Sequence, residues 1–167
     1  MRQPWVTLFL FPNLTSAELK KNFLTHRSKY YNWREGQLKQ FLKGIDEMER
    51  EFADAVFADL GRANNATTYC EILLLKGSAS HDLKHLKEYM KDINEETELL
   101  LAPARTMIKY EPLGVCGIYS AWNYPITTAL KPVIQCITTG NAVILKPSEV
   151  APATSKVLKK FVERYLD

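Results

Sequence analysis

The sequence predicts an α/β fold in which a helical region precedes the first part of a parallel sheet. Apolar residues recur every three or four positions through most of the first hundred residues, and two short apolar runs at 115–119 and 142–145 follow. A segment with helical spacing comes after each run, so the order from Val115 is βαβα, with right-handed crossovers. We divide the chain into a helical region, residues 1–100, and the first part of a sheet domain, residues 101–167.

The composition is that of a globular protein. Of the 167 residues, 46% are apolar and 25% are charged, and the net charge of +3 comes from interleaved basic and acidic residues. This mixed surface argues against a nucleic-acid partner. Three widely spaced cysteines favour a reducing, cytoplasmic location. No apolar run approaches the roughly 18 residues of a transmembrane segment, and residues 6–11 are too short for a signal sequence.

The first two predicted helices lie between residues 16 and 61. Ser16 is a suitable N-cap for a helix that runs towards Tyr30. From Arg34 onward one apolar stripe repeats at spacings of three and four, and Gly61 is the expected C-terminal stop. The stripe consists of Leu38, Phe41, Leu42, Ile45, Met48, Phe52 and Val56.

The middle of the chain changes from helical to extended character. Residues 66–93 form another amphipathic stretch, which we expect to weaken around Gly77–Ser78. Leu99–Leu101 and Arg105–Tyr110 are predicted to be extended segments interrupted by Ala102–Pro103.

The last third has the order strand, helix, strand, helix. Val115–Tyr119 is nearly all apolar, as expected for a strand covered on both faces. Pro125 suits the first turn of a helix that ends near Gly140. Ala142–Leu145 is the second buried strand, and a helix with one apolar side ends the chain. The apolar side consists of Val157, Leu158, Phe161, Val162, Tyr165 and Leu166.

Two segments in this third carry specific motifs, namely Glu111–Pro125 and Gly140–Glu149. Both resemble motifs of the aldehyde dehydrogenase superfamily, and Trp-Asn-Tyr-Pro and Lys-Pro-Ser-Glu are most similar to its class 3, or fatty-aldehyde, branch. The strong match covers residues 110–167. It implies an incomplete aldehyde dehydrogenase fold, in which residues 101–167 begin the Rossmann-like NAD(P)-binding domain and the catalytic domain is absent.

The departures from the class 3 pattern are few. Thr138 and Thr139 stand in a run where these relatives favour small residues, and Ser120 stands where several have glycine. The packing of the helix after Pro125 is therefore expected to differ in detail.

Asn123 is the candidate catalytic residue. It lies between a predicted strand and a helix, at the strand end where α/β proteins usually bind ligands. In the family that the motif resembles, a cysteine thiolate attacks the aldehyde, and this asparagine and a backbone N–H hold the resulting oxyanion. Hydride then passes to the nicotinamide, and water releases the acid. The alternative is that the Asn123 side chain only caps the following helix.

The resemblance assigns cofactor binding to Trp122, Lys146 and Glu149. Lys146 and Glu149 would hydrogen-bond the ribose hydroxyls of NAD, and the carboxylate would disfavour the additional phosphate of NADP, although class 3 relatives accept both. The alternative is an ordinary exposed ion pair. The sequence has no Gly-x-Gly-x-x-Gly fingerprint, which agrees with the atypical dinucleotide binding of this superfamily.

The nucleophilic cysteine and the general-base glutamate of the family have no counterpart here. Cys70, Cys116 and Cys136 are each expected to be small buried hydrophobic residues. His81 and His85 have a spacing that can bind zinc but lack a third ligand, and we predict no metal. The chain alone is therefore expected to be inactive, and the full-length enzyme to act on aldehydes as a homodimer.

Three hypotheses remain at this point. The chain is part of an NAD(P)-dependent aldehyde dehydrogenase, or a short, catalytically inactive product that acts as a nucleotide-binding or interaction module, or an unrelated helical protein with a fortuitous motif.

Overall fold

The computed structural model describes residues 6–8 and 16–167. The helices are α1 (Ser16–Phe23), α2 (Tyr31–Leu60), α3 (Asn64–Thr67), α4 (Leu73–Tyr89), α5 (Pro125–Thr139) and α6 (Pro152–Tyr165). The strands are β1 (Val6–Leu8), β2 (Ile93–Glu95), β3 (Thr106–Ile108), β4 (Val115–Tyr119) and β5 (Ala142–Lys146). The shorter turns are the 3-10 helices η1 (Arg27–Lys29) and η3 (Leu99–Leu101) and the π-helical turn η2 (Thr68–Ile72).

The sheet has the strand order β1-β5-β4, and both strand pairs are parallel. This confirms the predicted βαβα order of β4, α5, β5 and α6. The sequence did not predict β1, which pairs Val6 with Val143 and Leu8 with Leu145. Because β1 occupies one edge of β5, that strand lies in the middle of the sheet.

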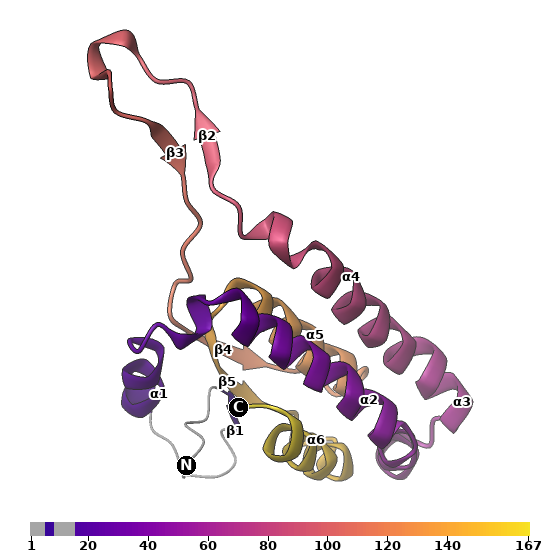
Figure 1. The fold of residues 1–167 in the computed structure, drawn as a ribbon. Coiled ribbons are helices and arrows are strands. Elements are labelled where there is room, and N and C mark those ends of the chain that lie inside the picture. The colour runs from indigo at the N-terminus through magenta and orange to yellow at the C-terminus, as the bar shows by residue number, and fades with distance from the viewer. Residues whose placement is uncertain (1–5, 9–15) are drawn as a thin grey trace.

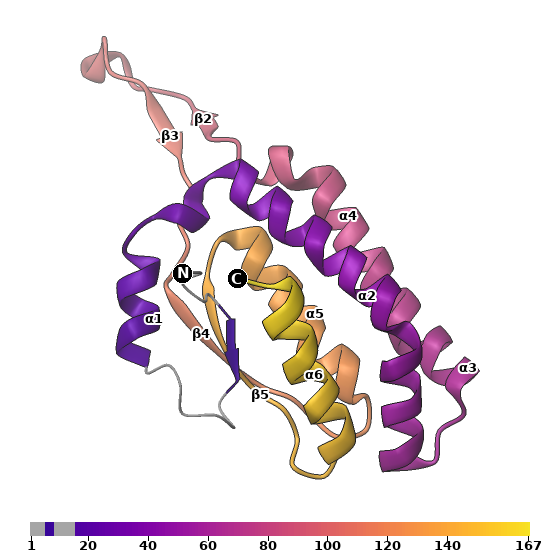
Figure 2. The same ribbon diagram turned by 60° about the horizontal axis from the view of Figure 1, so that its bottom comes forward.

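The helices form layers around this sheet. Figure 2 shows α5 and α6 beside the sheet, α2 and α4 outside them, and α1 on the opposite side of the sheet. The core lies mainly between α2, α5 and α6, where the Phe161 ring meets Phe41 edge-on at 5.3 Å and Phe52 at 5.7 Å between centroids. Helices α2 and α6 approach closely at Gly44, because a Cβ there would lie 2.6 Å from the Tyr165 ring.

The predicted helix ends are confirmed at two glycines. Gly61 follows α2 with φ of 67° and Gly140 follows α5 with φ of 84°, both in the left-handed region that favours glycine. The apolar stripe of α2 is buried as predicted, with Leu42 only partly so. Helix α1, by contrast, ends at Phe23 rather than near Tyr30.

Three other local predictions were wrong. Helix α4 continues through Gly77, and the irregular part of this stretch is η2, seven residues from it at Cys70. Leu99–Leu101 is a 3-10 turn and not an extended segment. Strand β4 is not covered on both faces, since Ile118 is buried while Tyr119 is 78% exposed.

The strands β2 and β3 form an antiparallel arm that stands away from the body (Figure 1). At its tip Leu99 and Leu100 are 90% and 93% exposed. Leu113, where the chain returns to the sheet, is 97% exposed. The arm therefore presents apolar side chains that the described body does not cover.

Among the helices of residues 16–167, we find none with the length and apolar character needed to cross a bilayer.

Candidate functional site

The two motif segments meet at the carboxyl edge of the sheet. Parallel pairing sets Tyr119, the last residue of β4, opposite Lys146, the last residue of β5. The Ser120 N–H then donates to the Lys146 carbonyl at 3.1 Å. The loops that follow the two strands therefore leave the sheet side by side, at the edge where ligands of α/β proteins bind.

Asn123 lies in the first of these loops with an exposed side chain. Within residues 6–8 and 16–167, its side-chain amide makes no hydrogen bond, and α5 has no side-chain cap from its own N-cap residue, Tyr124. The amide N–H groups of Ile126 and Thr127 donate instead to Glu71 Oε2, at 2.9 and 2.8 Å. Asn123 is therefore not the cap of α5, and its amide is available to a ligand.

The neighbouring residues of the first loop are partly open. Trp122 is 53% exposed and Tyr124 is 44% exposed. Ser120, which replaces the glycine of several relatives, is less exposed, and its hydroxyl has no hydrogen-bond partner among the described residues. The other departures, Thr138 and Thr139, are satisfied, because their hydroxyls donate to carbonyls of Ile134 and Gln135 at 2.9 and 2.8 Å.

Lys146 and Glu149 form an ion pair in the second loop. The side chains are 29% and 72% exposed, so both can meet a ligand from solvent. The hydrogen bond from the Lys146 ammonium lowers the pKa of the Glu149 carboxyl below its ordinary value. The ion pair thus favours the ionised carboxylate and keeps it beside the ammonium.

Sequence reasoning missed Glu71, which is fully buried in the turn η2. Its other oxygen, Oε1, accepts a hydrogen bond from Arg62 Nη1 at 2.6 Å. The sequence held a sign of this burial, because Glu71 is spaced by four residues from Leu75, and Leu75 by four from Ala79, so the three share one helix face. Leu75 and Ala79 are both buried. An acid on a buried helix face needs partners, and here these are the start of α5 and an arginine.

The three cysteines differ in exposure. The expectation that all three are buried was wrong for Cys70, which is exposed on η2, whereas Cys116 and Cys136 are partly buried. Burial, with a smaller contribution from Cys116, raises the pKa of Cys136 to about 12. Cys136 therefore stays a neutral thiol at physiological pH, and it lies near the end of α5 opposite Asn123.

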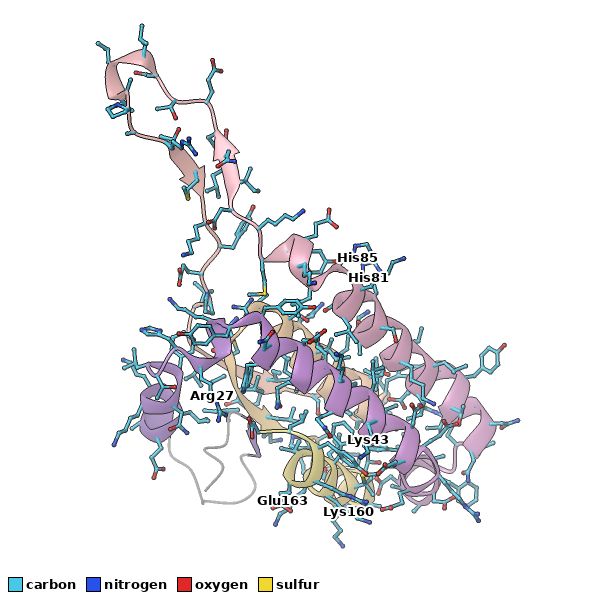
Figure 3. All side chains as sticks on the ribbon, viewed as in Figure 1. Arg27, Lys43, His81, His85, Lys160 and Glu163 are labelled. Carbon is cyan, nitrogen blue, oxygen red and sulfur yellow. The ribbon has the colours of Figure 1, made fainter. Side chains whose placement is uncertain are left out.

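The two histidines lie on the outer side of α4 (Figure 3). His81 pairs with the Tyr89 hydroxyl at 3.1 Å and His85 with Glu88 at 3.2 Å. In the part of the chain that the structure describes, no group of three or more His, Cys, Asp or Glu side chains is arranged to hold a metal ion.

A cavity of about 620 Å³ lies between the root of the arm and the C-terminal end of α5. Its lining includes Tyr89, Tyr110, Thr138 and Asn141. Since Asn123 precedes the N-terminal end of α5, this cavity is separate from the loops that carry the candidate residues.

The chain is thus an α/β protein whose exposed Asn123 amide and Lys146–Glu149 pair lie in the loops at the carboxyl ends of parallel strands. Residues 15–165 match the model of the aldehyde dehydrogenase family. The chain is 43% identical over 151 residues to aldehyde dehydrogenase family 3 member H1 of Arabidopsis thaliana, an alignment that covers 90% of this chain and 31% of that protein. The chain therefore belongs to the aldehyde dehydrogenase family.

Solved structures agree with this assignment. Substrate-bound AldH of Staphylococcus aureus has a TM-score of 0.85 and 34% identity, over 89% of this chain and 32% of that one. GapN of Methanocaldococcus jannaschii, solved with NADP, shares the fold with a TM-score of 0.68 and 22% identity, over 93% of this chain and 35% of that one. The chain spans about a third of the length of these relatives. The predicted resemblance to class 3 is confirmed by family 3 members of 33–43% identity.

Proposed function

We propose that a complete aldehyde dehydrogenase containing these 167 residues, hereafter the complete enzyme, oxidises aldehydes to carboxylic acids with NAD, or with NADP, as the cofactor. The family assignment supports the reaction class. The observation that carries the proposal is the free, exposed amide of Asn123 in the loop after β4, at the same edge of the sheet as the loop after β5 that holds the Lys146–Glu149 pair.

In this proposal Asn123 donates a hydrogen bond from Nδ2 to the oxygen of the substrate aldehyde. The oxygen becomes an oxyanion when a nucleophile adds to the carbonyl carbon, so the hydrogen bond is stronger in the transition state than in the ground state. A neutral amide suits this task because it donates a hydrogen bond without ionising in the physiological pH range. One such donor contributes about 2.7–4 kcal/mol to transition-state stabilisation.

The second loop would hold the cofactor. Lys146 donates to, and Glu149 accepts from, the hydroxyls of a ribose, while the ring of Trp122 lies open in the adjacent loop. The donor and acceptor set fits a ribose with free hydroxyls, and the negative charge of Glu149 opposes a phosphate there. When bound, the cofactor supplies the hydride acceptor of the reaction.

The thiols of this chain are not proposed as nucleophiles. Cys136 is neutral at physiological pH and lies near the far end of α5, and Cys116 is partly buried on β4. We propose that the attacking thiolate comes from the remainder of the complete enzyme, and that residues 1–167 alone do not turn over aldehydes.

We also propose that the complete enzyme is a homodimer. The β2–β3 arm supports this, since its tip exposes Leu99 and Leu100 almost completely (Figure 1). Apolar surface of this kind, held away from the body, is typical of a contact with another chain.

The test of the proposed function is Asn123→Ala in the complete enzyme. We expect kcat to fall by roughly 10²–10³ with little change in cofactor affinity, because the amide acts on the oxyanion. Steady-state kinetics with a medium-chain aldehyde and calorimetric NAD titration provide both quantities. An unchanged kcat would rule out the proposed role of Asn123.

A further inference from the structure

Helices α5 and α6 begin in the same way. Each has proline in its first position, where the missing N–H costs no hydrogen bond. In each, the next two N–H groups donate to one carboxylate from the outer helical layer. In α5, Glu71 accepts hydrogen bonds from the N–H groups of Ile126 and Thr127. In α6, Asp59 accepts hydrogen bonds from the N–H groups of Ala153 and Thr154, with N–O distances of 2.9 and 2.7 Å.

The loop of Asn123 has an additional attachment through Arg62. This guanidinium bonds Glu71 through Nη1 and donates through Nη2 to the main-chain carbonyl of Asn123. It also lies over the ring of Tyr124, with Cζ 4.7 Å from the ring centroid. One side chain thus contacts the residue that follows Asn123, the carboxylate behind the helix and Asn123 itself.

The far end of α5 is fixed as well. Arg34 is buried and donates through Nη1 to the carbonyl of Thr138 at 3.0 Å, and Ser28 Oγ donates to the carbonyl of Gly140 at 2.6 Å. A carboxylate at the N-terminus and a guanidinium at the C-terminus both match the helix dipole. Helix α5 therefore cannot slide along its axis without breaking contacts at one of its ends.

We propose that Glu71 and Arg62 are positioning residues for Asn123, and that Asp59 is the positioning residue for the Lys146–Glu149 loop. This inference rests on the proposed function, because it assigns each carboxylate to a different step. Glu71 fixes the direction of the amide that meets the oxyanion. Asp59 fixes the start of α6 and, through it, the loop that meets the ribose.

The assignment predicts that the two carboxylates affect different kinetic constants. Glu71→Gln in the complete enzyme keeps the side-chain shape but leaves Arg62 without its anion, so the Asn123 loop loses its fixed geometry. We expect kcat to fall by roughly ten- to a hundredfold, with KM for NAD unchanged within about twofold. Asp59→Asn should instead raise KM for NAD severalfold and leave kcat unchanged.

A matched control is Glu51→Gln, which removes an exposed ion pair between α2 and α6, with Lys160, at 2.6 Å. We expect neither constant to change, because no cap is lost. If Glu71→Gln does not fold, Arg62→Lys gives the same readout, since it keeps the charge but loses the second donor. It should also lower kcat without raising KM for NAD.

A double variant separates positioning from general weakening of the fold. If Glu71 acts through Asn123, Asn123→Ala with Glu71→Gln should be no slower than Asn123→Ala alone, within about twofold. Two results would overturn the inference. One is that the kcat losses of Asn123→Ala and Glu71→Gln multiply in the double variant. The other is that Glu71→Gln and Arg62→Lys both have a normal kcat while the kcat of Asn123→Ala is reduced. A normal kcat in Asn123→Ala would instead overturn the proposed function, and the positioning role with it.

Discussion

The units β4–α5 and β5–α6 have the same construction but differ in how firmly their loops are held. Glu71, which caps α5, is fully buried and paired with Arg62. Asp59, which caps α6, is only partly buried, takes a further hydrogen bond from the Thr154 hydroxyl at 2.7 Å, and has no cationic partner among the described residues. The unit with the candidate oxyanion donor thus has the more rigid attachment. The unit with the candidate ribose groups has the more solvent-accessible one.

The largest expected difference concerns stability. In the complete enzyme, Glu71→Ala removes one partner of a buried ion pair and the acceptor of two N–H groups at the start of α5, which should cost about 3–5 kcal/mol. Asp59→Ala should cost about 0.5–2 kcal/mol, the usual range for a lost helix cap. Urea-unfolding midpoints of the two variants provide the comparison. Equal losses would show that burial and Arg62 add nothing to the cap of α5.

The C-terminal ends of helices offer a second comparison, between Gly140 and Gly61. Both have positive φ, so alanine should cost about 1–2 kcal/mol at either position. At Gly140 a Cβ would also lie 2.6 Å from Arg34 Nη2 and 2.8 Å from the Ser28 carbonyl, whereas nothing lies within 4 Å at Gly61. Gly140→Ala should therefore be worse by about 1–3 kcal/mol. Thermal unfolding of both variants of the complete enzyme tests this, and equal shifts would contradict the close contact at α5.

The smallest expected effect is chemical and leaves the fold unchanged. With its pKa raised to about 12, Cys136 should resist iodoacetamide at pH 8, whereas the exposed Cys70 should react. Mass spectrometry of the native protein after timed alkylation identifies the modified thiols. Rapid labelling of Cys136 would show that the C-terminal end of α5 is accessible to solvent. That result would conflict with the contacts that Arg34 and Ser28 make with this end of the helix.

The sequence predicted those parts of the fold that local chemistry decides. Gly61 and Gly140 end helices because their φ values favour glycine, and Pro125 begins one because its ring fits the first turn. The position of Asn123 at a strand end followed from the same pattern. What the structure adds at Asn123 is that another residue, Glu71, caps the helix.

The features that escaped prediction depend on contacts between distant segments. Strand β1 has only three residues and exists through its pairing with β5, more than 130 positions away. Glu71 accepts a hydrogen bond from Ile126, which lies 55 positions away in the sequence, and no local sequence pattern predicts that pairing. The exposure of Tyr119 and Cys70 likewise depends on which segments pack over β4 and η2. The residues of β4 and η2 themselves do not predict those contacts.

The most direct test of the central claim is a crystal structure of the complete enzyme with NAD and a trapped aldehyde or acyl group. We predict that Asn123 Nδ2 lies about 2.7–3.1 Å from the substrate oxygen, with Arg62 still bonded to the Asn123 carbonyl and to Glu71. Lys146 and Glu149 should contact the hydroxyls of one ribose. An Asn123 amide turned away from the substrate oxygen, with another donor in its place, would contradict the account.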